Sequence, residues 1–381
     1  MDLLEYRIAY YSALAQEFEQ SGAGGRISTK NLNKALDVPV QVSLFEDMSA
    51  IASLKDPLDP YDMGSFFVPQ PQSHLVQDCC LRTKYGVVTV DDYVAHESLF
   101  HFPWFRYPQF NINGFQEDGV RCVLPSSPPD IELSAGFSVC CGIDENYYHW
   151  LVLFLGRLNY ENLHVWADKI RCKPTLVFPG FKSQLQHECA TVLANYYNVP
   201  FLSLSDQVSI KTKNLVVSEP MRSSGVIPHP AIRESLGVLK SHYYKSGDYP
   251  EKIYISRGDT NNRKMTNETL IEEMFRNQGY EILTLSGKSI SEQVNYFAHA
   301  KKIVGAHGSG LTNICFAEPG TKVLEIHMPN YLNWCYRRLA AVFSLDYQHI
   351  FGALTYEESY VHNSTFTLDP IKVMLCFDGL F

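Results

Sequence analysis

Short apolar runs alternate with helical patterns through the second half of the chain. The runs are too short for helices and predict buried strands. They comprise residues 252–256, 280–285, 302–305 and 322–326. Between them, residues 267–277 carry apolar side chains at helical spacing, and Gly279 follows as a stop signal. Ser289 and Glu292 form a capping box, which predicts the start of another helix. This alternation predicts a parallel sheet with helices on both faces.

The first half becomes regular only after about residue 136. Glycine and proline interrupt residues 1–130, so we expect an irregular region with short strands there. Strands and helices then alternate again, with a helix predicted over 182–197. Both halves together predict an α/β protein with two Rossmann-like domains that face each other across a cleft, preceded by an irregular, β-containing N-terminal region.

A break in the regular pattern at residues 219–228, which contain two prolines, marks the domain boundary. The predicted parts are an N-terminal domain of residues 1–222 (extension 1–130, α/β part 136–218), a C-terminal domain of residues 223–360 and a tail of residues 361–381. We expect the tail to pack back on the N-terminal domain.

Composition narrows the possible functions. The formal net charge is −9, from 32 basic and 41 acidic residues, which argues against nucleic acid as a partner. No apolar run approaches the ~20 residues of a membrane helix, and Asp2, Glu5 and Arg7 stand where a secretory signal needs apolar residues. The ten cysteines form no C-x-x-C pattern. We therefore expect a cytoplasmic protein with reduced thiols and no transmembrane segment, which leaves peripheral membrane contact open.

The most informative local motif is the loop of residues 305–313, GAHGSGLTN. It follows a predicted strand and leads into a helix, so it lies where open α/β sheets bind ligands. Its glycines allow close backbone approach, and free N–H groups at a helix start suit a diphosphate. The dehydrogenase pattern G-x-G-x-x-G does not fit, and His307 and Leu311 occupy the glycine positions of the hydrolase elbow. A tight turn without a ligand is the alternative.

Charged residues follow the neighbouring strands. Arg257 ends one strand and Arg263 lies in the next loop, so both could grip phosphate oxygens, with surface salt bridges as the alternative. Glu325 ends the strand after the glycine loop, where a carboxylate could accept ribose hydroxyl groups, or else form a cap or a buried ion pair. No D-x-D triplet occurs, and dispersed histidines such as His74 form no ligand spacing, so we expect no metal and no other cofactor.

A second candidate site lies in the N-terminal half. His149 follows the strand predicted at residues 136–142 and could act as a general base on an acceptor hydroxyl group. Asp144 and Glu145 compete for that role. Alternatively, His149 only fixes a helix start, and the aromatic residues beside it belong to the core or stack on sugar. These aromatic residues are Tyr147, Tyr148 and Trp150.

In order along the chain, four motifs resemble those of glycosyltransferase family 61. The motifs are Asn146-Tyr147-Tyr148-His149-Trp150; Tyr254-Ile255-Ser256-Arg257 with Arg263 and Asn267; GAHGSGLTN; and Pro319-Gly320-Thr321 ending in Glu325. The resemblance covers roughly residues 136–350, and Gly156 departs from it where proline is expected. The first 130 residues match nothing that could indicate the acceptor.

The resemblance implies a metal-independent, inverting glycosyltransferase of the GT-B fold. Its substrates would be a nucleotide sugar, with a UDP-sugar as the expected donor, and a glycan or glycolipid acceptor in polysaccharide biosynthesis. The implied donor-binding residues are Ser256, Arg257, Arg263, His307, Gly308, Ser309, Gly310, Leu311, Asn313 and Glu325. His149 and Asp144 are the candidate bases, and Tyr147, Tyr148 and Trp150 lie on the acceptor side. A catalytically silent nucleotide- or carbohydrate-binding protein of the same fold is the alternative, and a nucleotide-dependent oxidoreductase lacks its fingerprint.

Overall fold

The computed structural model divides the chain into two compact units. The first comprises residues 1–35 and 69–220, and the second comprises residues 36–68 and 221–381. The structure describes residues 3–9, 11–32, 36–40, 64–82, 86–95, 98, 112–113, 121–125, 129–140, 146–205, 208–218 and 227–379. The division after Pro220 lies two residues before the predicted boundary. The inclusion of residues 36–68 in the second unit was not predicted.

The first unit is built on a mixed sheet, which has twelve strands in the described part of the chain. The strands are β1 (Leu3–Ala9), β2 (Ile27–Asn31), β5 (Gln72–Arg82), β6 (Val87–Val90), β7 (Tyr93–Ala95), β8 (Ile112–Asn113), β9 (Arg121–Pro125), β10 (Ile131–Leu133), β11 (Gly136–Ser138), β12 (Thr175–Phe178), β13 (Phe201–Ser203) and β14 (Ile210–Ser218). Strands β13, β12, β11 and β14 are parallel, as predicted from the α/β pattern. Strand β5 pairs antiparallel with β14 and joins this part to the N-terminal strands.

The helices of the first unit are mostly short. They are α1 (Tyr11–Gln20), η2 (His149–Phe154), η3 (Leu155–Arg157), α3 (Tyr160–His164), α4 (Ala167–Ile170) and α5 (Gln184–Tyr197). Helix α5 confirms the helix predicted over 182–197. The Ser183 side chain caps its start by accepting from the Gln186 backbone N–H, and Asn198 ends it in the left-handed conformation. Segment η2 is a π-helical turn rather than an ordinary α-helix.

The second unit contains the parallel sheet predicted from the clearest part of the sequence. Five strands lie in the order β17-β15-β18-β19-β20, and every neighbouring pair is parallel. The strands are β15 (Lys252–Ile255), β17 (Glu281–Leu283), β18 (Lys302–Ala306), β19 (Lys322–His327) and β20 (Asp346–Phe351). A two-stranded antiparallel sheet also belongs to this unit and comprises β3 (Leu36–Pro39) and β4 (Ser65–Val68).

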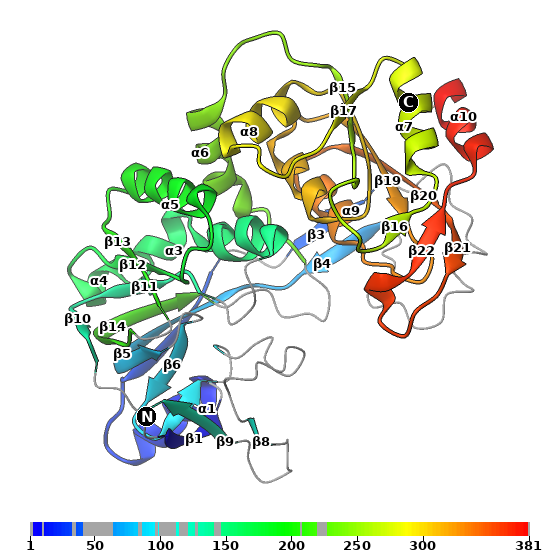
Figure 1. The fold of residues 1–381 in the computed structure, drawn as a ribbon. Helices are drawn as coiled ribbons and strands as arrows, with labels where there is room; N and C mark the ends of the chain where they lie inside the picture. The colour runs from blue at the N-terminus through cyan, green and yellow to red at the C-terminus, as the bar shows by residue number, and fades with distance from the viewer. Residues whose placement is uncertain are drawn as a thin grey trace. The chain divides into compact units, whose positions relative to one another are not determined.

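Helices flank this sheet (Figure 1). They are α6 (Ile232–Tyr243), α7 (Glu268–Asn277), α8 (Ile290–His299), η4 (Ser309–Phe316) and α9 (Cys335–Val342). Helices α6, α8 and α9 all contact η4. Side chains alternate between the faces of a strand, so Tyr254, Val304 and Leu324 join α7 in one apolar core. The intervening residues, including Glu325 and His327, lie on the opposite face of the sheet.

The C-terminal tail belongs to the second unit. It contributes η5 (Val361–Asn363), β22 (Thr365–Thr367) and α10 (Pro370–Gly379). Strand β22 pairs with β16 (Lys264–Met265) and β21 (Ala353–Tyr356). Phe366 and Val373 are buried in the same core as α7, and Figure 1 shows α10 beside α7. The expectation that the tail returns to the N-terminal domain is therefore wrong, because its apolar side chains complete the core of the second unit.

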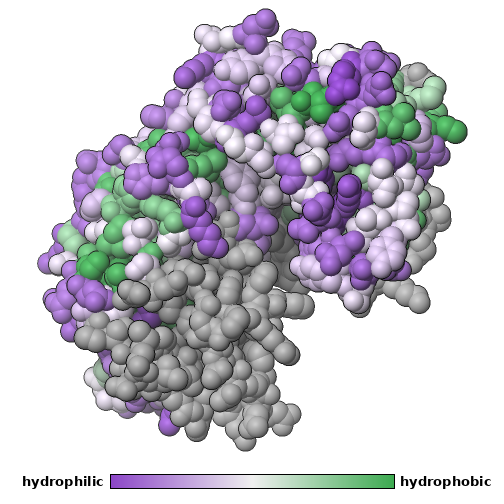
Figure 2. Space-filling view, in the orientation of Figure 1, coloured by the Kyte–Doolittle hydropathy of each residue, from purple (hydrophilic) through white to green (hydrophobic). Residues whose placement is uncertain are grey.

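The outer face of α10 remains apolar. Ile371, Met374 and Leu375 are exposed, and Figure 2 shows the apolar surface of this region at the upper right. None of the helices in the described ranges is long and apolar enough to cross a membrane.

Candidate functional site

The glycine loop follows β18 at the carboxyl end of the parallel sheet. His307 and Gly308 leave the strand, and η4 begins at Ser309 as a 3-10 helix instead of an α-helix. The backbone of Gly308 is extended, a conformation open to any residue. A Cβ atom at this position would, however, overlap Nη1 of Arg257. Glycine at this position lets a guanidinium group lie directly against the loop backbone.

Arg257 follows β15, and its backbone N–H donates to Oε1 of Glu268 at 2.9 Å. Its Nη2 donates to the Asn262 carbonyl oxygen at 2.6 Å, and its Nε is buried without a hydrogen-bond partner. Burial lowers the pKa of Arg257, and the nearby charge of Arg263 lowers it further. The predicted Ser256 shapes the turn: its hydroxyl oxygen accepts from the Gly258 backbone N–H at 3.1 Å. The turn thus holds a half-buried guanidinium group that forms no salt bridge with the described carboxylates, although the charges of Glu268 and Asp259 act on it.

Arg263 provides a second such cation. Its guanidinium group lies 4.7 Å from the centre of the Tyr331 ring and contacts Nδ1 of His362. The backbone of Arg263 has a φ of 50°, a left-handed conformation that is uncommon for arginine. A hydrogen bond of 2.7 Å from its N–H to the His362 carbonyl oxygen helps to hold it there. Like Arg257, Arg263 has a buried Nε without a partner and no ion pair within the described residues. Two guanidinium groups without salt bridges beside a glycine loop could bind an anion.

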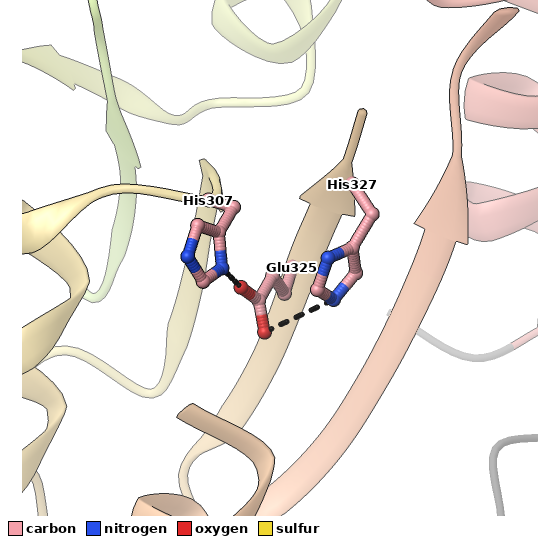
Figure 3. A group of neighbouring side chains, drawn as sticks. All are labelled: His307, Glu325 and His327. Carbon is pink, nitrogen blue, oxygen red and sulfur yellow. Dashed lines mark hydrogen bonds and ion pairs between the residues drawn. The ribbon is translucent and has the colours of Figure 1, made fainter. Parts of the chain in front are cut away.

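His307 turns one ring nitrogen toward the buried carboxylate of Glu325 (Figure 3). Its Nδ1 lies 2.5 Å from Oε1 of Glu325, and the hydroxyl group of Tyr347 donates to Oε2, also at 2.5 Å. Burial lowers the pKa of His307 to about 4, so the imidazole is neutral near pH 7. Burial also opposes ionisation of Glu325, but the neighbouring His327 and His307 lower the pKa of its carboxyl group overall. Glu325 is therefore an ionised acceptor.

This arrangement corrects the expectation for Glu325. The carboxylate is fully buried, and both oxygens already accept hydrogen bonds from the protein. Direct contact with a ribose is not available to it, and the alternative of a buried, paired acid is the one observed. Within the loop, it is the His307 side chain that contacts Glu325.

His327 lies on the side of the Glu325 carboxylate opposite His307, as Figure 3 shows. Its Nε2 is 3.3 Å from Oε2 of Glu325, and its ring centre is 5.5 Å from that of His307. Ligand atoms of His307, Glu325 and His327 all lie within 4.8 Å of one another, so these three residues could hold a metal ion. Sequence reasoning missed His327 and Tyr347. The pattern Glu-x-His on one strand, which places both side chains on the same face, is the signal that could have revealed His327.

The remaining loop residues divide into two groups. Leu311 and Asn313 are buried, and Nδ2 of Asn313 donates to Oε1 of Gln293 on α8 at 2.9 Å. They fasten η4 to the body of the unit. Ser309 and Gly310 are only partly buried. Of the loop residues predicted to bind a donor, these two retain an exposed portion next to His307 and Gly308.

The candidate acceptor-side residues belong to the first unit. Tyr148 and Trp150 are buried, which agrees with the alternative that they are core residues. His149 begins the π-helical turn η2 and is partly exposed, as is Tyr147. Asp144 lies outside the described residues. Such π-helical turns occur frequently at functional sites, so His149 remains the candidate base.

The part of the chain that matches a known protein family includes residues of both units. Residues 147–324 match the sequence model of a family described as Glycosyltransferase 61. No curated protein matches the chain. The matched range begins within the Asn146–Trp150 motif and contains both arginines and the whole glycine loop.

Proposed function

We propose that this chain transfers a sugar from a UDP-sugar to a hydroxyl group of a glycan or glycolipid acceptor, with inversion at the anomeric carbon. Residues 147–324 place the chain in glycosyltransferase family 61. The family indicates glycosyltransferase activity and therefore a sugar donor and an acceptor. The choice of donor, the inverting mechanism, a GT-B-like arrangement and a place in polysaccharide biosynthesis are our proposals.

The unpaired arginines carry the proposal. Arg257 lies against Gly308 with a buried Nε that lacks a partner, and Arg263 provides a second unpaired guanidinium group. Both side chains are half-buried and form no salt bridge within the described residues, so a ligand that supplies negative charge would stabilise them. A nucleotide diphosphate does so and presents oxygens to the forked guanidinium donors.

The same groups would act on the leaving group during transfer. When the bond between the sugar and the diphosphate breaks, negative charge develops on a phosphate oxygen. Two fixed cations in a partly dry site stabilise that charge without reorganisation. The metal-independence inferred from the sequence rests on this substitution of arginine for a divalent cation.

Inversion also requires a base that removes the proton of the acceptor hydroxyl group. We assign this role to the first unit, with His149 as the favoured residue and Asp144 as its rival. One base and one stabilised leaving group are sufficient for a single displacement at the anomeric carbon.

Calorimetric titration with UDP tests the donor site, with and without EDTA. We expect UDP binding in both conditions, weakened by roughly 1.5–3 kcal/mol in Arg257→Ala through loss of hydrogen bonds to a charged group. Arg276→Ala, at an exposed position on α7 of the same unit, is the matched control. A large loss of affinity in EDTA would show that a metal takes part.

Turnover separates an enzyme from a silent binding protein. Donor hydrolysis and transfer should be measured for a panel of UDP-sugars, with release of UDP as the readout. Release that depends on Arg257 supports the enzyme, whereas UDP binding without release from any donor supports the silent alternative.

A further inference from the structure

One ring nitrogen of His307 contacts Glu325, and the other has no hydrogen-bond partner among the described residues. Nδ1 lies 2.5 Å from Oε1 of Glu325, whereas Nε2 makes no hydrogen bond within the part of the chain that the structure describes. An ionised carboxylate can only accept, so the proton of this short contact belongs to Nδ1. Nε2 of the neutral ring is then an unprotonated acceptor.

The carboxylate that fixes this proton is itself held in place. Tyr347, on β20, donates its hydroxyl hydrogen to Oε2 at 2.5 Å, and Nε2 of His327 lies 3.3 Å from the same atom. Glu325 is fully buried, so its oxygens are shielded from bulk solvent. Tyr331 and Tyr336 flank the His307 ring, with centres 5.4 and 5.0 Å from its own. The ring is thus fixed in both its protonation pattern and its orientation.

The arginines near His307 are hydrogen-bond donors. Arg257 lies against Gly308, the next residue, and the charge of Arg263 is close enough to help lower the pKa of His307. Guanidinium groups and loop N–H groups only donate, which suits the oxygens of a diphosphate. A nucleotide sugar also carries hydroxyl groups on both sides of its diphosphate, and each hydroxyl hydrogen needs an acceptor.

We propose that Tyr347, Glu325 and His307 form a hydrogen-bonded relay that presents Nε2 of His307 as the acceptor for a hydroxyl group of the nucleotide sugar. His307 contacts the ligand, and Glu325 and Tyr347 are positioning residues. The proposal rests on the proposed function, because it takes the bound anion to be a nucleotide diphosphate. It assigns to His307 the hydroxyl recognition that the sequence suggested for Glu325.

Binding of four probes tests the relay: pyrophosphate, UDP, 2′,3′-dideoxy-UDP and UDP-glucose. His307→Asn keeps a polar group near the position of Nδ1 but removes the acceptor at Nε2. His307→Gln extends an amide toward the position of Nε2. We expect His307→Asn to weaken UDP or UDP-glucose binding about tenfold, the loss of one hydrogen bond, and His307→Gln to weaken it less. Pyrophosphate binding should not change in either variant.

The probes also identify which hydroxyl group is bound. If it belongs to the ribose, wild-type protein binds dideoxy-UDP about tenfold more weakly than UDP, and His307→Asn binds the two equally. If it belongs to the sugar, His307→Asn weakens UDP-glucose only. Unchanged binding of all four probes in His307→Asn would overturn the relay. Failure of wild-type protein to bind any of the four would instead overturn the proposed function.

Glu325→Gln gives the sharpest test of positioning. The amide oxygen would take the Tyr347 hydrogen bond, and the amide NH₂ would donate to Nδ1, which moves the imidazole proton to Nε2. Nitrogen-15 NMR of histidine-labelled protein reports this directly, with the His307 signals identified by their absence in His307→Gln. We expect a protonated Nδ1 in wild type and in Tyr347→Phe, and a protonated Nε2 in Glu325→Gln.

Two results would contradict the proposed protonation of His307 and therefore the relay. One is a protonated Nε2 in the wild-type protein. The other is one equivalent of a divalent metal, found by elemental analysis and removed by EDTA together with UDP binding, because His307, Glu325 and His327 would then be its ligands. Thermal unfolding of Tyr347→Phe and Glu325→Gln serves as the folding control. If Glu325→Gln does not fold, the Tyr347→Phe and wild-type spectra still decide the question.

Discussion

At the scale of single residues, the site depends on contacts that allow little variation. Gly308 leaves room for Arg257, and Glu325 holds the proton of His307. In both cases the residue acts on the position of a neighbouring side chain. A small change at either position should therefore affect binding more than folding.

Gly308→Ala tests the close approach of Arg257. The extended backbone accepts alanine without strain, but the new methyl group displaces the guanidinium group from the loop. We expect UDP binding to weaken by roughly 1–3 kcal/mol, as for loss of hydrogen bonds to a charged group, with little change in thermal stability. Gly237→Ala, within α6 and with open space around the glycine, is the control and should leave binding unchanged. Equal UDP affinity in Gly308→Ala and wild type would show that the Arg257 position is not needed.

At the scale of elements, the two candidate sites depend on unusual helices. Segment η4 is a 3-10 helix that follows the glycine loop, and η2 is a π-helical turn that begins at His149. Both are lined with buried apolar residues, so tertiary packing stabilises them where local propensity does not. The tail is a third case, because β22 and α10 complete a core begun more than a hundred residues earlier.

Replacement of His149 tests the turn η2 as the source of the base. If His149 is the base, His149→Ala should lower the transfer rate by roughly 10²–10⁴-fold while UDP affinity hardly changes. Asp144→Asn is the paired variant, assayed in the same way. Loss of transfer in Asp144→Asn alone would assign the base to the aspartate. Full activity in both variants would place the base elsewhere in the chain.

Truncation of Phe366 tests the position of the tail. Phe366 is 1% exposed on β22, and its removal leaves a cavity in the core of the second unit. We expect Phe366→Ala to reduce the free energy of unfolding by roughly 3–5 kcal/mol, measured by urea denaturation. Ile371→Ala, at a position 65% exposed on α10, should cost far less. Similar losses for the two variants would contradict the packing described here.

At the scale of the whole molecule, buried histidines link the site to stability. Burial lowers the pKa of His349 to about 3 and that of His307 to about 4. The pKa of His349 is lowered further by the charges of His327 and Arg337 and is raised by Glu325. The pKa of His307 is lowered further by His327 and Arg263 and is likewise raised by Glu325. Both histidines therefore stay neutral in the folded protein under conditions in which an unfolded chain would protonate them.

Stability should fall on mild acidification as a result. Between pH 6.5, the usual histidine pKa, and pH 4, the unfolded chain binds more protons than the folded one, so the free energy of unfolding decreases as pH falls. We expect a loss of about 1–3 kcal/mol between pH 7 and pH 5.5, measured by urea denaturation at each pH. His349→Gln should flatten this dependence, and His164→Gln, at an exposed position, should not. A stability that is constant across this range would contradict the burial of neutral histidines.

The sequence by itself determined the parallel α/β plan of the second unit and the place of the glycine loop. Periodicity and capping are local, so the helix predicted over 267–277 and the strand at 302–305 appear where expected. Arg257 and Arg263 could be selected because a strand end fixes where the next residues lie.

Only the tertiary structure decided which atoms meet. Whether Glu325 faces a ligand or a buried histidine depends on the order of strands in the sheet, which brings His307 from β18 and Tyr347 from β20 to either side of β19. Strands β3 and β4 and the tail join the second unit for the same reason. Their partners lie far away in sequence, and apolar burial between distant segments leaves no periodic signal within either one.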